Sequence, residues 1–237
     1  MAPNDIYQFS LISALMSGLA SSTSSTPISS LLTHGTFGVG TFESMDGEMI
    51  VLDSTAYQFH ADGSTNIVSP SQLVPFAMVS DFQPQKSQAI SLPSKQAMLD
   101  TVDDAFPHAK NAFVLFRLQG RFRHVRIRAI HKQAYAGQKL AELAEGQMVR
   151  EFANVEGTVV GLRSPRWSEG VSVVGVHAHF IDEGRAFGGH VLGIEGAGEV
   201  RFEGSVGGKL ELELPGSTEF GERELELDRA GIRQAEG

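Results

Sequence analysis

The sequence predicts an α+β protein that is rich in β-structure, with two small mixed-sheet domains and few helices. Three observations support this fold class. From Gly38 onward, apolar and polar residues alternate in many short runs, and a period of two is typical of strands. The 26 glycines, together with many Val, Ile and Phe residues, indicate strands joined by turns. Stretches with helical spacing are short and few.

Composition excludes several classes of partner. A net charge of −9 argues against general binding to nucleic acid or to an anionic membrane surface. The absence of cysteine excludes disulfides and thiolate ligands, so any metal must be held by histidine and carboxylate. The apolar run at 9–20 follows Asp5 without a preceding Lys or Arg, which is wrong for a signal peptide, and it is too short to span a bilayer. We expect a cytoplasmic protein.

The first part of the chain reads as two helices followed by strands. Apolar residues recur at helical spacing from Ile6 to Leu19, which predicts an amphipathic helix. Thr26-Pro27 and Gly35 are typical start and stop signals of a second, short helix. The elements expected next are a hairpin of 38–43 with 48–53 around Asp46-Gly47, strands at 56–60 and 74–80, a helix at 95–106 capped by Ser94, and a hairpin of 112–118 with 121–130 around Gln119-Gly120.

A domain boundary is expected near residue 133. Ala, Gln and Glu become frequent there, and a helix at about 138–145 again precedes a glycine-rich strand, as at the start of the chain. We therefore predict an N-terminal mixed domain at 1–133 and a C-terminal β-rich domain at 134–237. Strands should dominate the interval 156–214, and a last short helix is expected at 228–234.

Three histidines mark the predicted hairpin of the second domain. His177 and His179 are two residues apart in an apolar strand, so both imidazoles face the same side. If Glu183-Gly184 is a two-residue loop, His190 on the next strand lies directly opposite His177. Three imidazoles on one rigid face, with the remaining coordination positions open, predict a catalytic site for Zn²⁺ or another divalent metal.

The hairpin segment HAHFIDEGRAFGGHVL resembles the signature of the alpha-acetolactate decarboxylase family. Four other segments resemble that family in the same order, so the resemblance reaches across nearly the whole chain. They are IYQFSLISALMSGL at 6–19, GTFESMDGEMIVLD at 40–53, VSPSQLVPFAMV at 68–79 and EGTVVGLRSP at 156–165.

The resemblance implies a lyase that converts acetolactate to acetoin and carbon dioxide through a metal-stabilised enediolate, on the route to butanediol. It also implies a homodimer. Glu48, Arg128 and Glu236 match catalytic positions of the family, while Thr41 and Arg128 match positions near the substrate. Whether Glu48 or Glu236 delivers the proton, and which is a metal ligand, stays open.

Arg128 belongs to an alternating run in which His124, Arg126 and Arg128 share one face of a strand. The planar guanidinium is suited to a substrate carboxylate, and the resemblance selects Arg128 for this role and leaves Arg126 at the surface. Two alternatives to the decarboxylase remain at this stage: a non-catalytic β protein with a structural metal, and a metal-dependent hydrolase. A closed fourth ligand position would favour the structural site.

Overall fold

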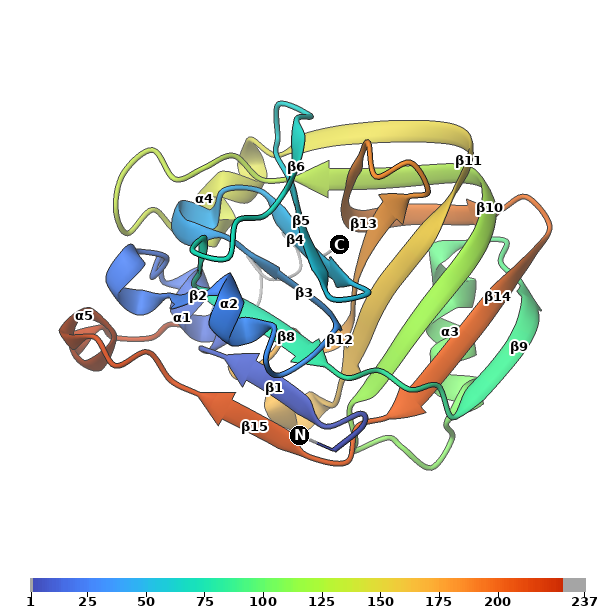
Figure 1. The fold of residues 1–237 in the computed structure, drawn as a ribbon, viewed down its shortest axis with the longest axis horizontal. Coiled ribbons are helices and arrows are strands. Elements are labelled where there is room, and N and C mark those ends of the chain that lie inside the picture. Colours follow the sequence, from blue (N-terminus) through green and yellow to red (C-terminus); the bar gives the residue numbers. More distant parts are fainter. Residues whose placement is uncertain (1, 228–237) are drawn as a thin grey trace.

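The computed structural model describes residues 2–227, and Figure 1 shows two main sheets side by side. The β-rich fold with few helices is therefore confirmed. The first sheet has seven strands in the order β15-β1-β8-β3-β4-β5-β6, and all pairs are antiparallel except β1 with β15. Its strands are β1 (Ile6–Phe9), β3 (Phe37–Thr41), β4 (Glu48–Leu52), β5 (Thr55–Phe59), β6 (Thr65–Ile67), β8 (Phe76–Ser80) and β15 (Leu210–Glu213).

The second sheet has six strands and partly closes on itself. Its order is β11-β12-β13-β10-β14-β9, and β11 also pairs with β10, so that β10, β11, β12 and β13 form a ring. The strands are β9 (Lys86–Ser91), β10 (Val114–Ala129), β11 (Met148–Ser164), β12 (Gly175–Asp182), β13 (Gly188–Gly196) and β14 (Glu199–Val206). The histidine-bearing strands β12 and β13 have neighbours on both sides, and ring closure gives β11 a second neighbour as well.

Helices are short and lie outside the sheets. In Figure 1, α3 lies beside β10, β14 and β9, and its apolar residues join the core on that face of the sheet. The α-helices are α1 (Ile12–Met16), α2 (Ile28–Leu31), α3 (Lys95–Ala105), α4 (Leu140–Glu145) and α5 (Thr218–Glu222). The remaining elements are the strands β2 (Thr26–Pro27) and β7 (Leu73–Val74) and the 3₁₀ turns η1 (Ser22–Ser24), η2 (Glu43–Met45) and η3 (Arg166–Ser168).

One apolar cluster fills the space between the two sheets. It combines side chains of β3, β4 and β8 with side chains of β10, β11 and β12. Because side chains alternate along a strand, Ile50 and Leu52 of β4 enter this cluster, while Met49 and Val51 enter another cluster on the far face. The same alternation directs Glu48, at the start of β4, into the space between the sheets.

The helix expected from Ile6 to Leu19 is wrong in its first half. Ile6–Phe9 is strand β1, which has β8 on one side and β15 on the other, and only Ile12–Met16 is helical. Both faces of β1 are buried, with Ile6 and Tyr7 in different clusters. A strand buried on both faces carries apolar residues in succession, and this run happened to match helical spacing.

The hairpin expected around Gln119-Gly120 is also wrong, because β10 is one continuous strand of 16 residues. Gly120 faces Gly157 of β11, so two residues without side chains meet where a turn was expected. On its other edge, β10 pairs with β14 up to Gln119 and with β13 from Phe122. The glycine therefore marks a change of partner and not a reversal of the chain.

Other elements agree with expectation. The hairpin of β3 with β4 and the helix α3, capped by the Ser94 side chain, are confirmed, and α4 lies within the helix expected at 138–145. The helix expected at 228–234 lies outside the described residues. The boundary near residue 133 stays a prediction; β10, which precedes it, pairs along its length with β11, which follows it. Among residues 2–227, no helix is long and apolar enough to cross a bilayer.

Candidate metal centre

The three histidines come from β12 and β13, in a register that differs from the expected one. His179, and not His177, lies opposite His190. The two-residue loop was wrong because the N–H of Asp182 donates to the carbonyl of Phe187, which leaves four residues in the loop. A shift of two residues preserves the face of every side chain, so all three imidazoles still share one side.

Asp182 determines this longer loop. Its carboxylate accepts hydrogen bonds from the N–H groups of Gly184, Ala186 and Phe187 at 3.0, 2.6 and 2.8 Å. Arg185 takes a left-handed conformation with φ of 59° inside the loop. Asp182 thus belongs to the turn and not to the metal site.

The imidazoles form a compact buried cluster. Ring centroids of His177, His179 and His190 are 4.8, 5.2 and 5.5 Å apart, and one ligand nitrogen from each lies within 4.8 Å of the others. The Nδ1 atom of His179 lies 2.9 Å from the carbonyl oxygen of Met49. Since a carbonyl only accepts, Nδ1 carries the proton, and the lone pair of His179 is on Nε2, which faces the cluster.

Burial keeps His177 and His179 neutral. It lowers the pKa of His177 to about 3, and the positive charges of Arg128 and Lys95 act in the same direction. It also lowers the pKa of His179 to about 3, assisted by His177, while Glu48 opposes the shift. Neutral imidazoles are the form that binds a metal, so the donor set present here fits a divalent ion such as Zn²⁺.

Glu48, from the first sheet, forms a buried ion pair with Arg128 of the second sheet beside the histidines. Glu48 begins β4 and Arg128 lies near the end of β10, and their side chains are 5% and 3% exposed. Arg128 Nη1 lies 2.5 Å from Glu48 Oε1, and Glu48 Oε2 lies 3.4 Å from His179 Nε2. The backbone N–H of Ile130 also donates to Glu48 Oε1, at 3.4 Å. This arrangement joins both sheets at one point.

A narrow cavity lies beside this ion pair. Thr41, opposite Glu48 in the β3–β4 hairpin, contributes to it and donates its hydroxyl hydrogen to the carbonyl of Gly47 at 2.7 Å. The cavity has a polar end and apolar walls, and it is lined by Thr41, Glu48, Arg128, His177, Ile12, Leu15, Gly40, Phe76, Ile130 and Leu140. A small molecule with charged and methyl groups would suit such a lining.

Sequence reasoning named four of these lining residues and missed the apolar walls and the Met49 carbonyl. Apolar residues such as Leu15 and Leu140 carry no signal that separates a cavity wall from ordinary core. Glu236 lies outside the described residues, so its place at the site stays a prediction.

Comparison with known proteins gives a consistent result. A family model for alpha-acetolactate decarboxylase matches residues 6–227. An alpha-acetolactate decarboxylase from Klebsiella aerogenes is 39% identical over 235 residues, which cover 98% of this chain and 88% of that protein. One from Methanosarcina mazei is 36% identical and covers 94% of this chain and 77% of its own length. The crystal structure of alpha-acetolactate decarboxylase from Bacillus subtilis strain 168 matches with a TM-score of 0.92 and 30% identity, covering 98% of this chain and 99% of that one. The resemblance seen in the sequence is thereby confirmed, and the chain belongs to the alpha-acetolactate decarboxylase family.

Proposed function

We infer that this chain decarboxylates 2-acetolactate to acetoin and carbon dioxide, as a carboxy-lyase. Membership of the family supports this activity. The structural observation that supports it most directly is the buried meeting of three histidines with Glu48 and Arg128 beside a narrow cavity.

His177, His179 and His190 would hold one divalent cation, and we propose Zn²⁺, because three neutral nitrogen donors without thiolates suit it. When bound, such a cation acts as a Lewis acid toward the substrate's ketone and hydroxyl oxygens. The Met49 carbonyl fixes the tautomer of His179 and therefore the direction of its lone pair.

Arg128 binds the substrate carboxylate through its planar set of N–H donors. The bond between that carboxylate and the substrate carbon breaks, carbon dioxide leaves, and the electron pair stays on the substrate. Glu48 takes up a proton from solvent before the substrate binds and delivers it to this carbon, which restores the carboxylate; its carboxyl group lies 3.4 Å from His179 Nε2, beside the histidines. Glu236 is the second candidate for this proton transfer. Thr41 retains acceptor capacity on its oxygen and binds the substrate hydroxyl. The apolar walls exclude water from the reacting carbon.

The test is incubation of the purified protein with racemic acetolactate, with acetoin and carbon dioxide both measured. Equal amounts of the two products are expected. A parallel panel of esters tests the hydrolase alternative, which would release acid and no carbon dioxide. Ester turnover without acetoin would refute the decarboxylase, and a metal-loaded protein inactive on both panels would favour a structural metal site.

Assembly and location are separate proposals that follow from the family resemblance and the sequence. We propose a homodimer of the 25.5 kDa chain in the cytoplasm. Sedimentation at the mass of a single chain would reject the dimer, and cell fractionation would test the location.

A further inference from the structure

The turn between β3 and β4 has a demanding backbone, and Glu48 follows it directly. Ser44 and Met45 take left-handed conformations with φ of 61° and 53°, and Gly47 has φ of 79°. Residues other than glycine rarely adopt this region, and they hold it only where the surroundings enforce it. Something must therefore keep this turn in place.

The side chains of Gln58 and His60 hold Asp46 at the centre of the turn, and Asn66 links the two. Gln58 Nε2 donates to the backbone carbonyl of Asp46 at 2.7 Å, and His60 Nδ1 lies 3.1 Å from the Asp46 carboxylate. His60 Nε2 lies 2.9 Å from Asn66 Oδ1, and Asn66 Nδ2 donates to Gln58 Oε1 at 3.4 Å. The contacts close into a loop, which we call the polar ring: Asp46, Gln58, His60 and Asn66.

The polar ring is anchored in regular structure on one side and in the turn on the other. Gln58 and Asn66 face each other across β5 and β6, so their backbones are fixed by the sheet. Asp46 has no strand partner, and its carbonyl and carboxylate are both held by the ring. The ring thus transfers the rigidity of the sheet to the turn.

Glu48 is two residues beyond Asp46, and its carboxylate makes contacts that require accurate placement. Glu48 is the first residue of its strand, and its carboxylate oxygens lie 2.5 Å from Arg128 Nη1 and 3.4 Å from His179 Nε2. Gly47 packs closely against the next strand, because a Cβ there would overlap the carbonyl oxygen of Phe59. A displacement of about 1 Å at a reacting group can cost on the order of a hundredfold in rate.

We propose that the polar ring is a positioning device for the reaction, in which His60 and Asp46 act through Glu48 without touching substrate. This proposal rests on the proposed function, because it assigns the ring to the same proton transfer. When the polar ring is broken, the carboxyl group of Glu48 would still be present, but it would be displaced from its position beside Arg128 and His179. The loss should therefore fall on kcat more than on KM.

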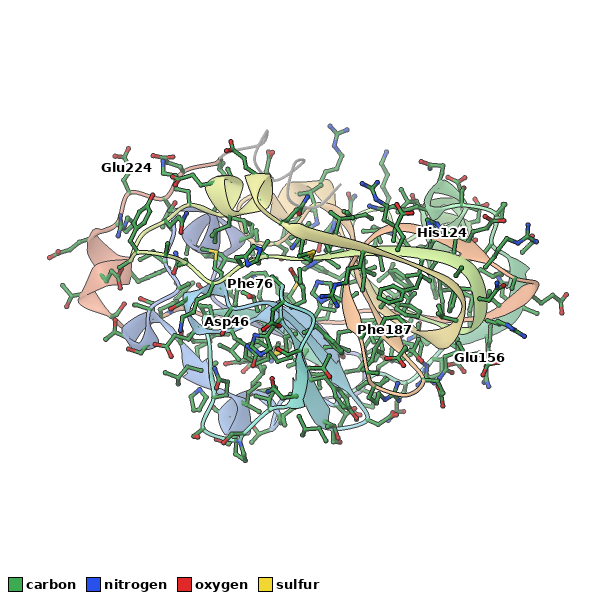
Figure 2. All side chains as sticks on the ribbon, turned by 90° about the horizontal axis from the view of Figure 1, so that it is seen from above. Asp46, Phe76, His124, Glu156, Phe187 and Glu224 are labelled. Carbon is green, nitrogen blue, oxygen red and sulfur yellow. The ribbon has the colours of Figure 1, made fainter. Side chains whose placement is uncertain are left out.

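The kinetic experiment compares His60→Ala, Asp46→Ala and the double variant with His124→Ala in the metal-loaded protein. His124 is the matched control, since it also contacts a carboxylate, Glu151, at 3.4 Å but is 40% exposed. Figure 2 labels Asp46 and His124 in opposite halves of the molecule. Each ring variant should lower kcat about tenfold, with KM within about threefold and metal content unchanged. The double variant should lose no more than either single variant, because each breaks the same ring.

Conservative variants separate hydrogen bonding from charge. Asp46→Asn keeps an oxygen that accepts from His60, so most of kcat should return relative to Asp46→Ala. Asn66→Ala opens the polar ring at an exposed residue, and it replaces His60→Ala in the comparison if that variant does not fold. We expect Asn66→Ala to lower kcat about threefold. A kcat for the folded ring variants equal to that of His124→Ala would overturn the proposal.

Crystal structures of wild type and His60→Ala provide a test that needs no activity. The proposal expects the turn at 43–47 to relax and Glu48 to leave Arg128. If wild type proves inactive on acetolactate, the proposed function fails. The crystal structures still show whether the polar ring positions Glu48. Glu48 unmoved on Arg128 in His60→Ala would refute the positioning role.

Discussion

Arg126 and Arg128 are two residues apart on β10, yet they meet different surroundings. The Arg128 side chain is 3% exposed and lies against Glu48, whereas that of Arg126 is 48% exposed and pairs with Glu151 at 3.5 Å. Between them the pairing of β10 with β13 shifts, since Arg126 faces Gly193 and Ile127 faces Val191. The shift occurs where the strand passes from the surface into the space between the sheets.

This contrast gives a matched pair of variants. Arg128→Lys keeps the positive charge but loses the planar set of N–H donors. kcat/KM should therefore fall by about ten- to a thousandfold, on the order of 1.4–4 kcal/mol. Arg126→Lys should change it by less than about 0.5 kcal/mol. Steady-state kinetics on both variants, with metal content as a control, checks this. The reverse pattern would place the carboxylate site two residues earlier on the strand.

The pKa values of His177 and His179 predict how the metal-free protein responds to acid. Each drops from 6.5 to about 3 on burial, so between these values the unfolded chain binds more protons than the folded one. Stability is therefore lost as the pH falls below about 6.5, by up to about 1.4 kcal/mol per pH unit for each histidine.

Urea unfolding of the metal-free protein between pH 7 and 5 measures this dependence, in a range above the ordinary titration of carboxylates. His177→Asn should flatten the slope, because one buried titrating group is removed. A free energy of unfolding that does not change over this range would contradict the assignment of neutral buried histidines.

For single residues, the sequence predicted which side chains share a face but did not predict the backbone groups that contact them. Alternation and the expected hairpin brought His177, His179 and His190 to one face, even though the register was wrong by two. Glu48 and Arg128 needed the family resemblance, because no period links residues on different sheets. The Met49 carbonyl had no signal, since every residue carries one.

The closed set of strands β10, β11, β12 and β13 depends on glycines that leave room for large aromatic side chains. A Cβ on Gly161 of β11 would overlap the ring of the buried Phe116, whereas one on Gly193 of β13 would meet Arg126 Cβ at an ordinary 3.5 Å. Strand interiors normally disfavour glycine, so close packing explains its presence at 161.

Gly161→Ala should therefore lower the free energy of unfolding by about 1–3 kcal/mol, and Gly193→Ala by less than about 0.5 kcal/mol. Chemical denaturation of both variants in the same buffer measures the difference. Equal losses would mean that Phe116 moves aside at little cost.

The β3–β4 hairpin and α3 were predictable because the Asp46-Gly47 turn and the Ser94 cap act locally. Strand β1 and the continuous β10 were not, because their form depends on partners far along the chain: β15 and β8 for one, and β13 and β14 for the other. Burial on both faces removed the alternation that would have identified β1.

For the whole molecule, metal binding should add to stability, because the three histidines proposed as its ligands are brought together only in the folded chain. Removing metal with a chelator should abolish activity and lower the thermal midpoint, while the β-sheet signal in circular dichroism persists. With metal at 100 to 1,000 times its dissociation constant, the difference is about 2.7–4.1 kcal/mol. Added Zn²⁺ should restore both properties. Activity that survives complete removal would refute the metal centre.

The parallel pairing of β1 with β15 has a consequence for synthesis in the cell. Ile6 faces Leu210, so the ribosome must make about 200 more residues before β1 gains its last neighbour. At about 5–20 residues per second, that takes roughly 10 to 40 s. Every residue of β1 is at most 2% exposed in the finished fold, and until then one of its edges can pair with other chains. A nascent chain of this protein therefore carries one unpaired edge on β1 until β15 leaves the ribosome.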